Sequence, residues 1–175
     1  MIHMMIGIQG SGKTTFAKQL AKELKIKIIS TDSVRVNMPG IKEELVWPYV
    51  YKQVALAITE GKDVIFDATS ITPRVRKRFV DEVEKYGVKC EICAYYFDVE
   101  KEVCVQRVAQ RNKDRSQINI PIEVVYSFSD KIIPPTILTD LTELNVELEG
   151  WKTINGESWD FNNGTITGPL ELVAS

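Results

Sequence analysis

The sequence predicts a three-layer α/β/α fold, in which helices cover both faces of a parallel sheet. Short apolar segments of strand character alternate with longer segments of helical periodicity along most of the chain, a pattern typical of such sheets. A glycine-rich turn joins the first strand to the first helix. From about Leu138 the alternation stops, which predicts a small antiparallel β extension at the carboxyl end.

The spacing of apolar residues predicts the elements in order. The expected strands are His3–Ile6, Ile26–Ile29, Val64–Phe66, Glu91–Phe97 and Leu144–Leu148. The expected helices are Thr14–Leu24, Lys42–Thr59, Pro73–Tyr86, Glu100–Arg111 and Ile122–Asp130. Near the carboxyl end, the turn signal Asn155-Gly156 predicts a hairpin between Trp151–Ile154 and Glu157–Phe161.

Residues 7–14 form a complete phosphate-binding loop with the sequence Gly-Ile-Gln-Gly-Ser-Gly-Lys-Thr. The loop lies between an apolar strand and an amphipathic helix, which is the context that this motif requires. Lys13 is expected to reach the β- and γ-phosphates of ATP, and the Thr14 hydroxyl is expected to ligate Mg²⁺. The predicted nucleotide-binding residues here are Gly10, Ser11, Gly12, Lys13, Thr14 and Thr15. The motif therefore predicts a fold of P-loop NTPase type.

Composition places limits on the partners. The 175 residues carry a net charge of −2, with 44% apolar and 26% charged residues, which is ordinary for one globular domain. This charge gives no overall attraction for nucleic acid, so such a contact requires a local basic surface. No apolar run approaches membrane-spanning length. We expect a cytoplasmic protein without a membrane partner, and the sequence leaves its oligomeric state open.

An Asp32-x-x-Arg35 pair follows the second predicted strand, and Asp67 ends the third. Ligands bind at the carboxyl ends of parallel strands, so these side chains should face the same crevice as Lys13. Asp32 can accept the proton of an attacking hydroxyl, and Arg35 can hold an anionic group of the acceptor. The alternative is that Asp32 only caps a helix and that Arg35 is solvated.

Asp67 ends an apolar strand as the acid of a Walker B segment does, so it can hold a Mg²⁺-bound water or fix Arg35. Thr72 and Pro73 then begin a helix. The first turn carries four cations, Arg74, Arg76, Lys77 and Arg78. These cations oppose the helix dipole, and a bound polyanion would offset that cost. A solvated basic face is the alternative.

Three arginines lie four residues apart further along, at Arg107, Arg111 and Arg115. They could form a lid in which an arginine stabilises the charge on the transferring phosphoryl group. The alternative is a helix face on which these arginines form salt bridges.

In this order and spacing, the motifs resemble those of the 5′-hydroxyl polynucleotide kinase family. The likeness runs from residue 1 to about residue 136. It comprises the phosphate loop, Asp32-x-x-Arg35, Asp67-Ala68-Thr69 with Thr72-Pro73 and Arg76, Arg111-Asn112-x-x-Arg115, residues 120–125 and Pro134-Pro135-Thr136. The phosphate loop is widespread, whereas the later motifs are more specific.

The resemblance implies a role for each matching residue. Lys13 and Thr14 would bind the ATP phosphates and Mg²⁺, and Asp32 would be the general base. Arg35 would contact the phosphate beside the acceptor hydroxyl. Asp67, which is also a candidate metal ligand through water, would organise that pocket. The remaining implied contacts are Thr69 and Arg76 with the substrate, and Arg111 and the lid arginine Arg115 with the donor phosphates.

We therefore expect residues 1–137 to form a P-loop kinase domain, and residues 138–175 to add a last strand and the small β extension to it. The predicted activity is ATP- and Mg²⁺-dependent transfer of the γ-phosphate to a hydroxyl, with the 5′-hydroxyl end of DNA or RNA as acceptor. The alternatives are a small-molecule, nucleoside or zeta-toxin-like sugar-nucleotide kinase, which shares these motifs, and a regulatory ATPase without an acceptor.

Overall fold

The computed structural model describes residues 1–114, 119–136, 151–153 and 170–174. In chain order its elements are β1 (Ile2–Ile6), α1 (Lys13–Leu24), β2 (Lys27–Ile29), α2 (Thr31–Asn37), α3 (Glu43–Thr59), β3 (Val64–Phe66), α4 (Pro73–Glu84), β4 (Ile92–Tyr96), α5 (Lys101–Arg111), α6 (Ile122–Ser129), β5 (Trp151–Thr153) and β6 (Leu170–Ala174). Within these ranges, no helix has the length and apolar character needed to cross a membrane.

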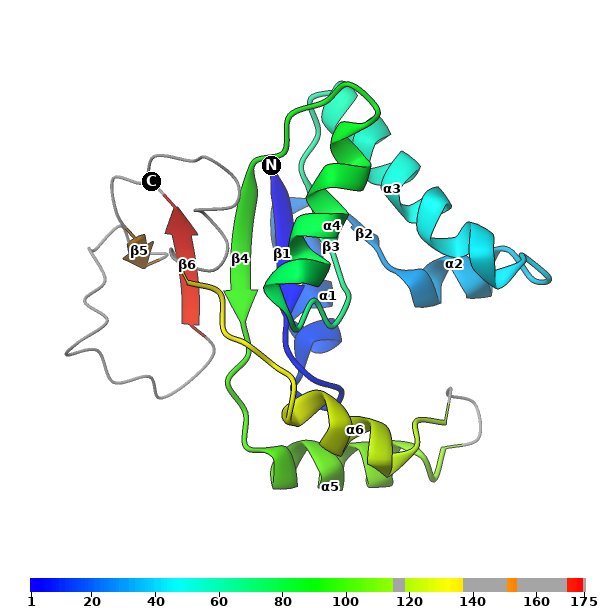
Figure 1. The fold of residues 1–175 in the computed structure, drawn as a ribbon, viewed down its shortest axis with the longest axis vertical. Coiled ribbons are helices and arrows are strands. Elements are labelled where there is room, and N and C mark those ends of the chain that lie inside the picture. The colour runs from blue at the N-terminus through cyan, green and yellow to red at the C-terminus, as the bar shows by residue number, and fades with distance from the viewer. Residues whose placement is uncertain (115–118, 137–150, 154–169, 175) are drawn as a thin grey trace.

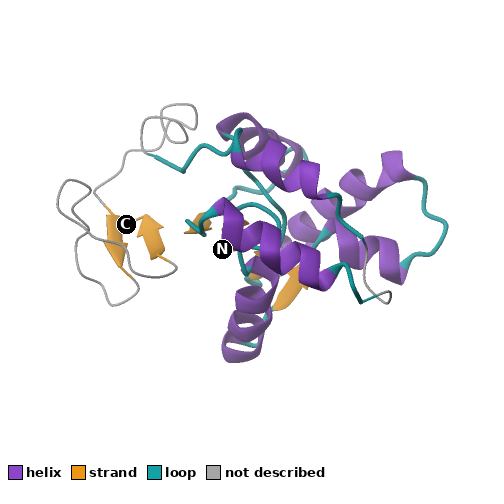
Figure 2. Cartoon of the chain, turned by 90° about the horizontal axis from the view of Figure 1, so that it is seen from below, coloured by secondary structure: helices purple, strands orange, loops and turns teal. Residues whose placement is uncertain are grey.

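The strands form one sheet in the order β2-β3-β1-β4-β6-β5. The first four are parallel, as the sequence predicts, because β3 pairs with β2 and β1, and β1 pairs with β4. β6 runs antiparallel to β4, and β5 runs antiparallel to β6. Seen from below, the helices gather around β1–β4, whereas β5 and β6 lie at the far edge of the sheet (Figure 2).

Both faces of the parallel sheet are covered, which explains why β1 is buried along its whole length. Successive side chains of a strand point to opposite faces, so neighbouring methionines enter different cores. Met4 packs with residues of α3 and α4 such as Val50 and Phe79. Met5 packs with Ala17 and Leu20 of α1 on the other face.

A third core lies beyond the sheet, where α5 and α6 pack together at the carboxyl ends of the parallel strands (Figure 1). Cys104 and Val108 of α5 meet Val125 of α6, and Ile8 of the phosphate loop joins them. Ile71, from the segment after β3, completes this cluster. The α5–α6 pair therefore packs against the two loops that follow β1 and β3.

The observed elements match the predicted ones closely over residues 1–136. β3 has the predicted bounds, and the other matched elements differ by one or two residues at their ends. The structure adds α2, whose start the sequence left open. The predicted strand Leu144–Leu148, the turn at Asn155-Gly156 and the segment Glu157–Phe161 lie outside the described residues.

Candidate active site

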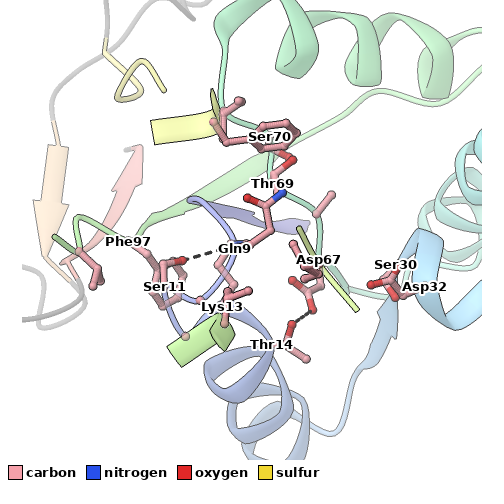
Figure 3. Close-up of a pocket in the computed structure, with 18 of the residues that line it drawn as sticks. Gln9, Ser11, Lys13, Thr14, Ser30, Asp32, Asp67, Thr69, Ser70 and Phe97 are labelled. Carbon is pink, nitrogen blue, oxygen red and sulfur yellow. Dashed lines mark hydrogen bonds between the residues drawn. The ribbon is translucent and has the colours of Figure 1, made fainter. Parts of the chain in front are cut away.

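A cleft of about 1790 Å³ opens at the carboxyl ends of the parallel strands. The phosphate loop, the start of α2, the segment after β3 and the α5–α6 pair line it, as the close-up in Figure 3 shows in part. Pockets for one small ligand measure roughly 300–1,000 Å³. This cleft therefore has room for a nucleotide and a second substrate.

The phosphate loop has the backbone that its glycines permit. Gly10 and Gly12 have φ angles of +81° and +99°. Gly12 precedes the first turn of α1, and no side chain caps that turn, so its N–H groups are left for an anion. A Cβ on Gly10 would lie 2.5 Å from the carbonyl oxygen of Cys104, which shows how closely the loop sits on α5. Thr15, in the first turn, also lines the cleft.

Lys13 turns back into the loop. Its Nζ donates to the carbonyl oxygen of Ile8 at 2.6 Å and to Ser11 Oγ at 3.3 Å. Burial lowers the pKa of Lys13 to about 8, although the negative charge of Asp67 acts in the opposite direction. A bound polyphosphate would favour the ammonium form, so the loop fits an anionic ligand.

Thr14 and Asp67 come together at the base of the cleft, where Thr14 Oγ1 donates to Asp67 Oδ2 at 2.8 Å (Figure 3). Burial raises the pKa of Asp67, while the hydrogen bond from Thr14 and the charge of Lys13 lower it. A hydroxyl and a carboxylate are the oxygen ligands that Mg²⁺ prefers. This pair therefore fits the predicted metal ion, which would also compensate the buried carboxylate.

Asp32 is not the cap of its helix. The cap of α2 is Ser30, whose Oγ accepts a hydrogen bond from the backbone N–H of Ser33 at 3.0 Å. The Asp32 side chain lines the cleft and is 66% exposed. Among the residues that the structure describes, its Oδ1 forms an ion pair with Arg35 Nη1 at 3.0 Å. The carboxylate is thus held at one oxygen and open to a ligand at the other.

Arg35 is partly exposed and forms ion pairs on both sides, with Asp32 and with Glu43. Its Nε and Nη2 both donate to the carboxylate of Glu43, with an Nε–Oε2 distance of 3.1 Å. The hydrogen bonds with Glu43 raise the pKa of Arg35 and lower that of Glu43. The sequence gives no role to Glu43, although acids are favoured in the first turn of a helix, where this residue lies.

The segment after β3 is fixed on two sides. The backbone N–H of Gly7 donates to the carbonyl oxygen of Thr69 at 3.0 Å, and Thr69 lines the cleft. Arg76 is 5% exposed, and its Nη1 donates to the carbonyl oxygens of Ser70 and Ile133 at 2.9 and 3.1 Å. Arg76 therefore supports this segment from outside the cleft, which differs from the expectation that it contacts the substrate.

Two arginines of α5 lie near the phosphate loop, where a nucleotide would bind. Arg107 Nη1 donates to the carbonyl oxygen of Gly10 at 3.3 Å, and Arg111 lines the cleft. Neither forms an ion pair with the residues that the structure describes. Asn112 joins the end of α5 to Ile120 by two hydrogen bonds of 2.7 and 3.0 Å. Arg115, the expected lid arginine, lies outside the described residues.

Among the residues that line the cleft without having been expected there, three bear on the site. Gln9 and Ser70 bring polar side chains to it, and Trp47 of α3 brings an aromatic one. The indole packs against Tyr51 and Phe66, at centroid distances of 5.7 and 6.3 Å. Gln9 fills an unrestricted position of the loop motif, and Trp47 has the pattern of a core residue, so no sequence signal distinguishes them.

Comparison with known proteins gives a family and a fold. Residues 2–135 match the model of the AAA domain family. No curated protein matches the sequence. The structure is similar to a chain of the Pnkp1/Rnl/Hen1 RNA repair complex, with a TM-score of 0.64 and 22% identity over 83% of this chain and 46% of that one. The present chain thus spans less than half of that relative.

Two further structures share the fold. Kti12 from Chaetomium thermophilum, solved with ADP-AlF3, has a TM-score of 0.59 and 16% identity over 79% of this chain and 83% of its own. The APS kinase CysC of Mycobacterium tuberculosis, solved with AMPPNP and APS, has a TM-score of 0.51 and 17% identity over 66% of this chain and 73% of its own. Identities this low show the fold alone. With the match over residues 2–135, the chain belongs to the AAA domain family and has a P-loop kinase-like fold.

Proposed function

We propose that the protein is an ATP- and Mg²⁺-dependent kinase that phosphorylates a hydroxyl group. One observation carries this proposal: the carboxylate of Asp32 and the phosphate loop with Lys13 line the same cleft. A nucleotide-dependent switch or a simple ATPase needs the loop but has no need for an acid open to a second substrate. The space and the exposed acid therefore favour a kinase over a regulatory ATPase.

The donor side is formed by residues that fit ATP. Lys13 and the N–H groups at the start of α1 would bind the phosphates, and Arg111 would add a cation from α5. Thr14 and Asp67 would hold Mg²⁺, which neutralises phosphate charge when it is bound. Arg115 follows Arg111 by one helical turn's spacing in the sequence, so it remains a proposed contact with the donor phosphates.

On the acceptor side, Asp32 would take the proton of the attacking hydroxyl. The hydroxyl oxygen then forms a bond to the γ-phosphorus while the bond from that phosphorus to the bridging oxygen breaks, and ADP leaves with the electron pair. Arg35 is held by hydrogen bonds to Glu43, and its own hydrogen bond to Asp32 would fix the orientation of that carboxylate. Positioning of this kind and a general base supply most of what phosphoryl transfer requires.

The first candidate acceptor is the 5′-hydroxyl end of a nucleic acid. The order of the motifs supports it, and the similar chain in the RNA repair complex agrees with it. Arg74 and Arg78 are exposed cations on α4, which begins directly after the segment that lines the cleft. They offer the local basic surface that a chain of net charge −2 would need for such a partner.

A small hydroxyl-bearing molecule is the second candidate. The contacts of Arg35 favour it, because Glu43 and Asp32 already neutralise this cation and leave less charge for a phosphate of the acceptor. The shared fold with an APS kinase agrees with this possibility.

The test is γ-labelled ATP with a panel of 5′-hydroxyl oligonucleotides, nucleosides, 3′-nucleotides and sugars. We expect Mg²⁺-dependent label on one class of acceptor, and turnover of Asp32→Asn lower by about 10²- to 10⁴-fold while ATP binding stays near that of the unaltered chain. Glu44→Gln removes an exposed carboxylate of α3 outside the cleft and serves as the matched control. ATP hydrolysis without any labelled acceptor would make the protein an ATPase instead.

A further inference from the structure

Three buried side-chain atoms have no hydrogen-bond partner among the described residues, and all three residues line the cleft. The atoms are Gln9 Oε1, Ser70 Oγ and Arg111 Nε. Buried polar atoms in proteins nearly always have a partner, so such atoms need an explanation. Ordered water or a ligand supplies such partners, and the gathering of all three atoms in one cleft favours a ligand.

The chemistry of the three atoms separates them into two groups. Arg111 Nε is a donor, which fits the phosphate oxygens of the nucleotide. Gln9 Oε1 is an acceptor, and in this orientation of the amide it takes an N–H or O–H group. Ser70 Oγ can both donate and accept. Gln9 and Ser70 therefore suit a different ligand group from the one that suits Arg111.

Ser70 is held in a conformation that few residues other than glycine adopt. Its φ is +45° and its exposed fraction is 2%. The backbone cannot relax easily, because the carbonyl oxygens of Thr69 and Ser70 accept hydrogen bonds from Gly7 N and Arg76 Nη1 at 3.0 and 2.9 Å. Strain maintained in this way is typical of functional sites.

Gln9 lies close to this segment. Figure 3 shows its side-chain amide directed away from Lys13 and towards Thr69 and Ser70. The neighbouring charges balance one another, because Asp67 is negative and the Arg76 guanidinium donates to the carbonyl oxygen of Ser70. Arg35 is already neutralised by Glu43. A neutral group that can both donate and accept satisfies all of these conditions, and a hydroxyl is the simplest one.

We propose that Gln9 and Ser70 bind a second hydroxyl of the acceptor, near the one that is phosphorylated. This inference rests on the proposed kinase activity and narrows its acceptor to a molecule of sugar type with a free neighbouring hydroxyl. Such a hydroxyl is the 2′-hydroxyl on the ribose of an RNA end or another hydroxyl of a free sugar. The 5′-terminal deoxyribose of a DNA strand has none, because its 3′-oxygen is part of a phosphodiester.

The test compares kcat/KM for acceptor pairs that differ by one hydroxyl. The pairs are a 5′-hydroxyl RNA and the DNA of the same sequence, a ribonucleoside 3′-phosphate and its 2′-deoxy form, and a sugar and its deoxy analogue. In one of these pairs we expect kcat/KM to be about 10- to 100-fold higher for the member with the hydroxyl. That pair identifies the kind of acceptor that carries the recognised hydroxyl. Ser70→Ala and Gln9→Met should each reduce that preference to less than about threefold.

Stability measurements separate recognition from a structural role. Ser70→Ala keeps the Cβ and removes an unpartnered hydroxyl, so its melting temperature should equal or exceed that of the unaltered chain. Thr59→Val is the matched control, because it removes a hydroxyl that donates to the carbonyl oxygen of Ala55 outside the cleft. This control should leave the preference between acceptors unchanged.

Several outcomes would overturn the inference. Equal kcat/KM for both members of every pair would do so, as would a preference that survives both variants. A Gln9→Met variant that changes only the Mg²⁺ requirement would assign the amide to water around the metal. Transfer without preference overturns this inference alone, whereas the absence of transfer to any acceptor overturns the proposed kinase activity as well.

Discussion

Lys13 is a buried cation whose hydrogen-bond partners are neutral oxygen atoms of Ile8 and Ser11. Its pKa falls to about 8 because burial disfavours the ammonium. A side chain in this state does not contribute to stability through its charge. Its environment is instead suited to a charged ligand, which is typical of functional sites.

Lys13→Met should therefore abolish ATP binding and leave the melting temperature unchanged or slightly higher. Methionine keeps the length of the buried stem and removes the desolvated charge. Calorimetric titration with ATP and thermal melting measure the two effects. Lys22→Met, an exposed lysine of the same helix outside the cleft, is the control that should still bind ATP. A melting temperature many degrees lower would show that Lys13 is structural.

At this scale, sequence predicts those site residues whose chemistry belongs to a contiguous motif. Lys13, Thr14 and Asp67 are of this kind, and the structure brings them together. Ser70 and Glu43 have no such motif. Ser70 matters because the fold buries its hydroxyl without a partner. Glu43 matters because the turn between α2 and α3 brings it against Arg35, eight residues earlier in the chain.

Among the elements, the phosphate loop and α5 lie so close at Gly10 that no side chain fits between them. Gly10 lies against Cys104 with a φ of +81°, whereas Gly87, after α4, has a φ of +80° and open space around its Cβ position. The two glycines share their backbone conformation and differ in their neighbours. Alanine at each position therefore separates backbone strain from collision.

We expect Gly87→Ala to lower the free energy of unfolding by about 1 kcal/mol, through strain alone. Gly10→Ala adds a collision of the new Cβ with Cys104, so it should lower the free energy of unfolding by about 1–3 kcal/mol more. It should also weaken ATP binding, because the loop must move off α5. Urea unfolding and ATP titration measure these effects. Equal destabilisation by the two substitutions would mean that α5 yields to the loop.

His3 on β1 and Tyr95 on β4 form a buried pair, with 2.8 Å between Nδ1 and the phenol oxygen. Burial lowers the pKa of His3 below its ordinary 6.5. The unfolded chain therefore binds a proton at a higher pH than the folded one. It follows that this pair stabilises the fold fully above pH 6.5, and that the contribution is lost as the pH falls below that value.

The free energy of unfolding should fall between pH 7.5 and 5.5 by more in the unaltered chain than in His3→Gln. The difference is at most about 1.4 kcal/mol, the linkage limit one unit below the unfolded pKa. Urea midpoints at the two pH values measure it. His3 is the single histidine of the sequence, so no other imidazole contributes. Parallel losses in both proteins would show that His3 is protonated equally in the folded and unfolded chains.

Elements were predictable because apolar spacing records which faces are buried, and the two cores on either side of β1 follow that spacing. The ends of elements depend on local hydrogen bonds, which spacing does not record. The start of α2 is an example, since the reciprocal hydrogen bonds of Ser30 and Ser33 determine it. The order of the strands in the sheet could not be predicted in this way. It depends on pairing between strands far apart in the chain, which the alternation of strands and helices does not determine.

For the molecule as a whole, the distribution of charge matters more than the net charge of −2. Arg74 and Arg78 are exposed near the cleft, whereas Lys62 and Lys85 lie on loops at the opposite ends of the strands. A polynucleotide that enters the cleft would pass the first pair and not the second. Each phosphate contact contributes to the salt dependence of binding.

If the acceptor is a polynucleotide, Arg74→Gln with Arg78→Gln should raise its KM and reduce the salt slope by about one unit per lost contact. The KM for a 3′-mononucleotide should hardly change. Lys62→Gln with Lys85→Gln removes the same charge at the far end and should alter neither value. Equal KM values for a ten-nucleotide strand and a mononucleotide in every variant would favour the small-molecule acceptor.

The anchoring of Arg76 also determines the order in which the chain can complete its cleft during synthesis. The guanidinium binds the carbonyl oxygen of Ile133, 57 residues later, and the N–H of Ile133 binds the carbonyl oxygen of Ile71. At about 5–20 residues per second, a ribosome needs about 3–11 s to make the intervening chain. Until then the arginine lacks one of its acceptors, so the segment that holds Ser70 reaches its final form only after α6 has been made.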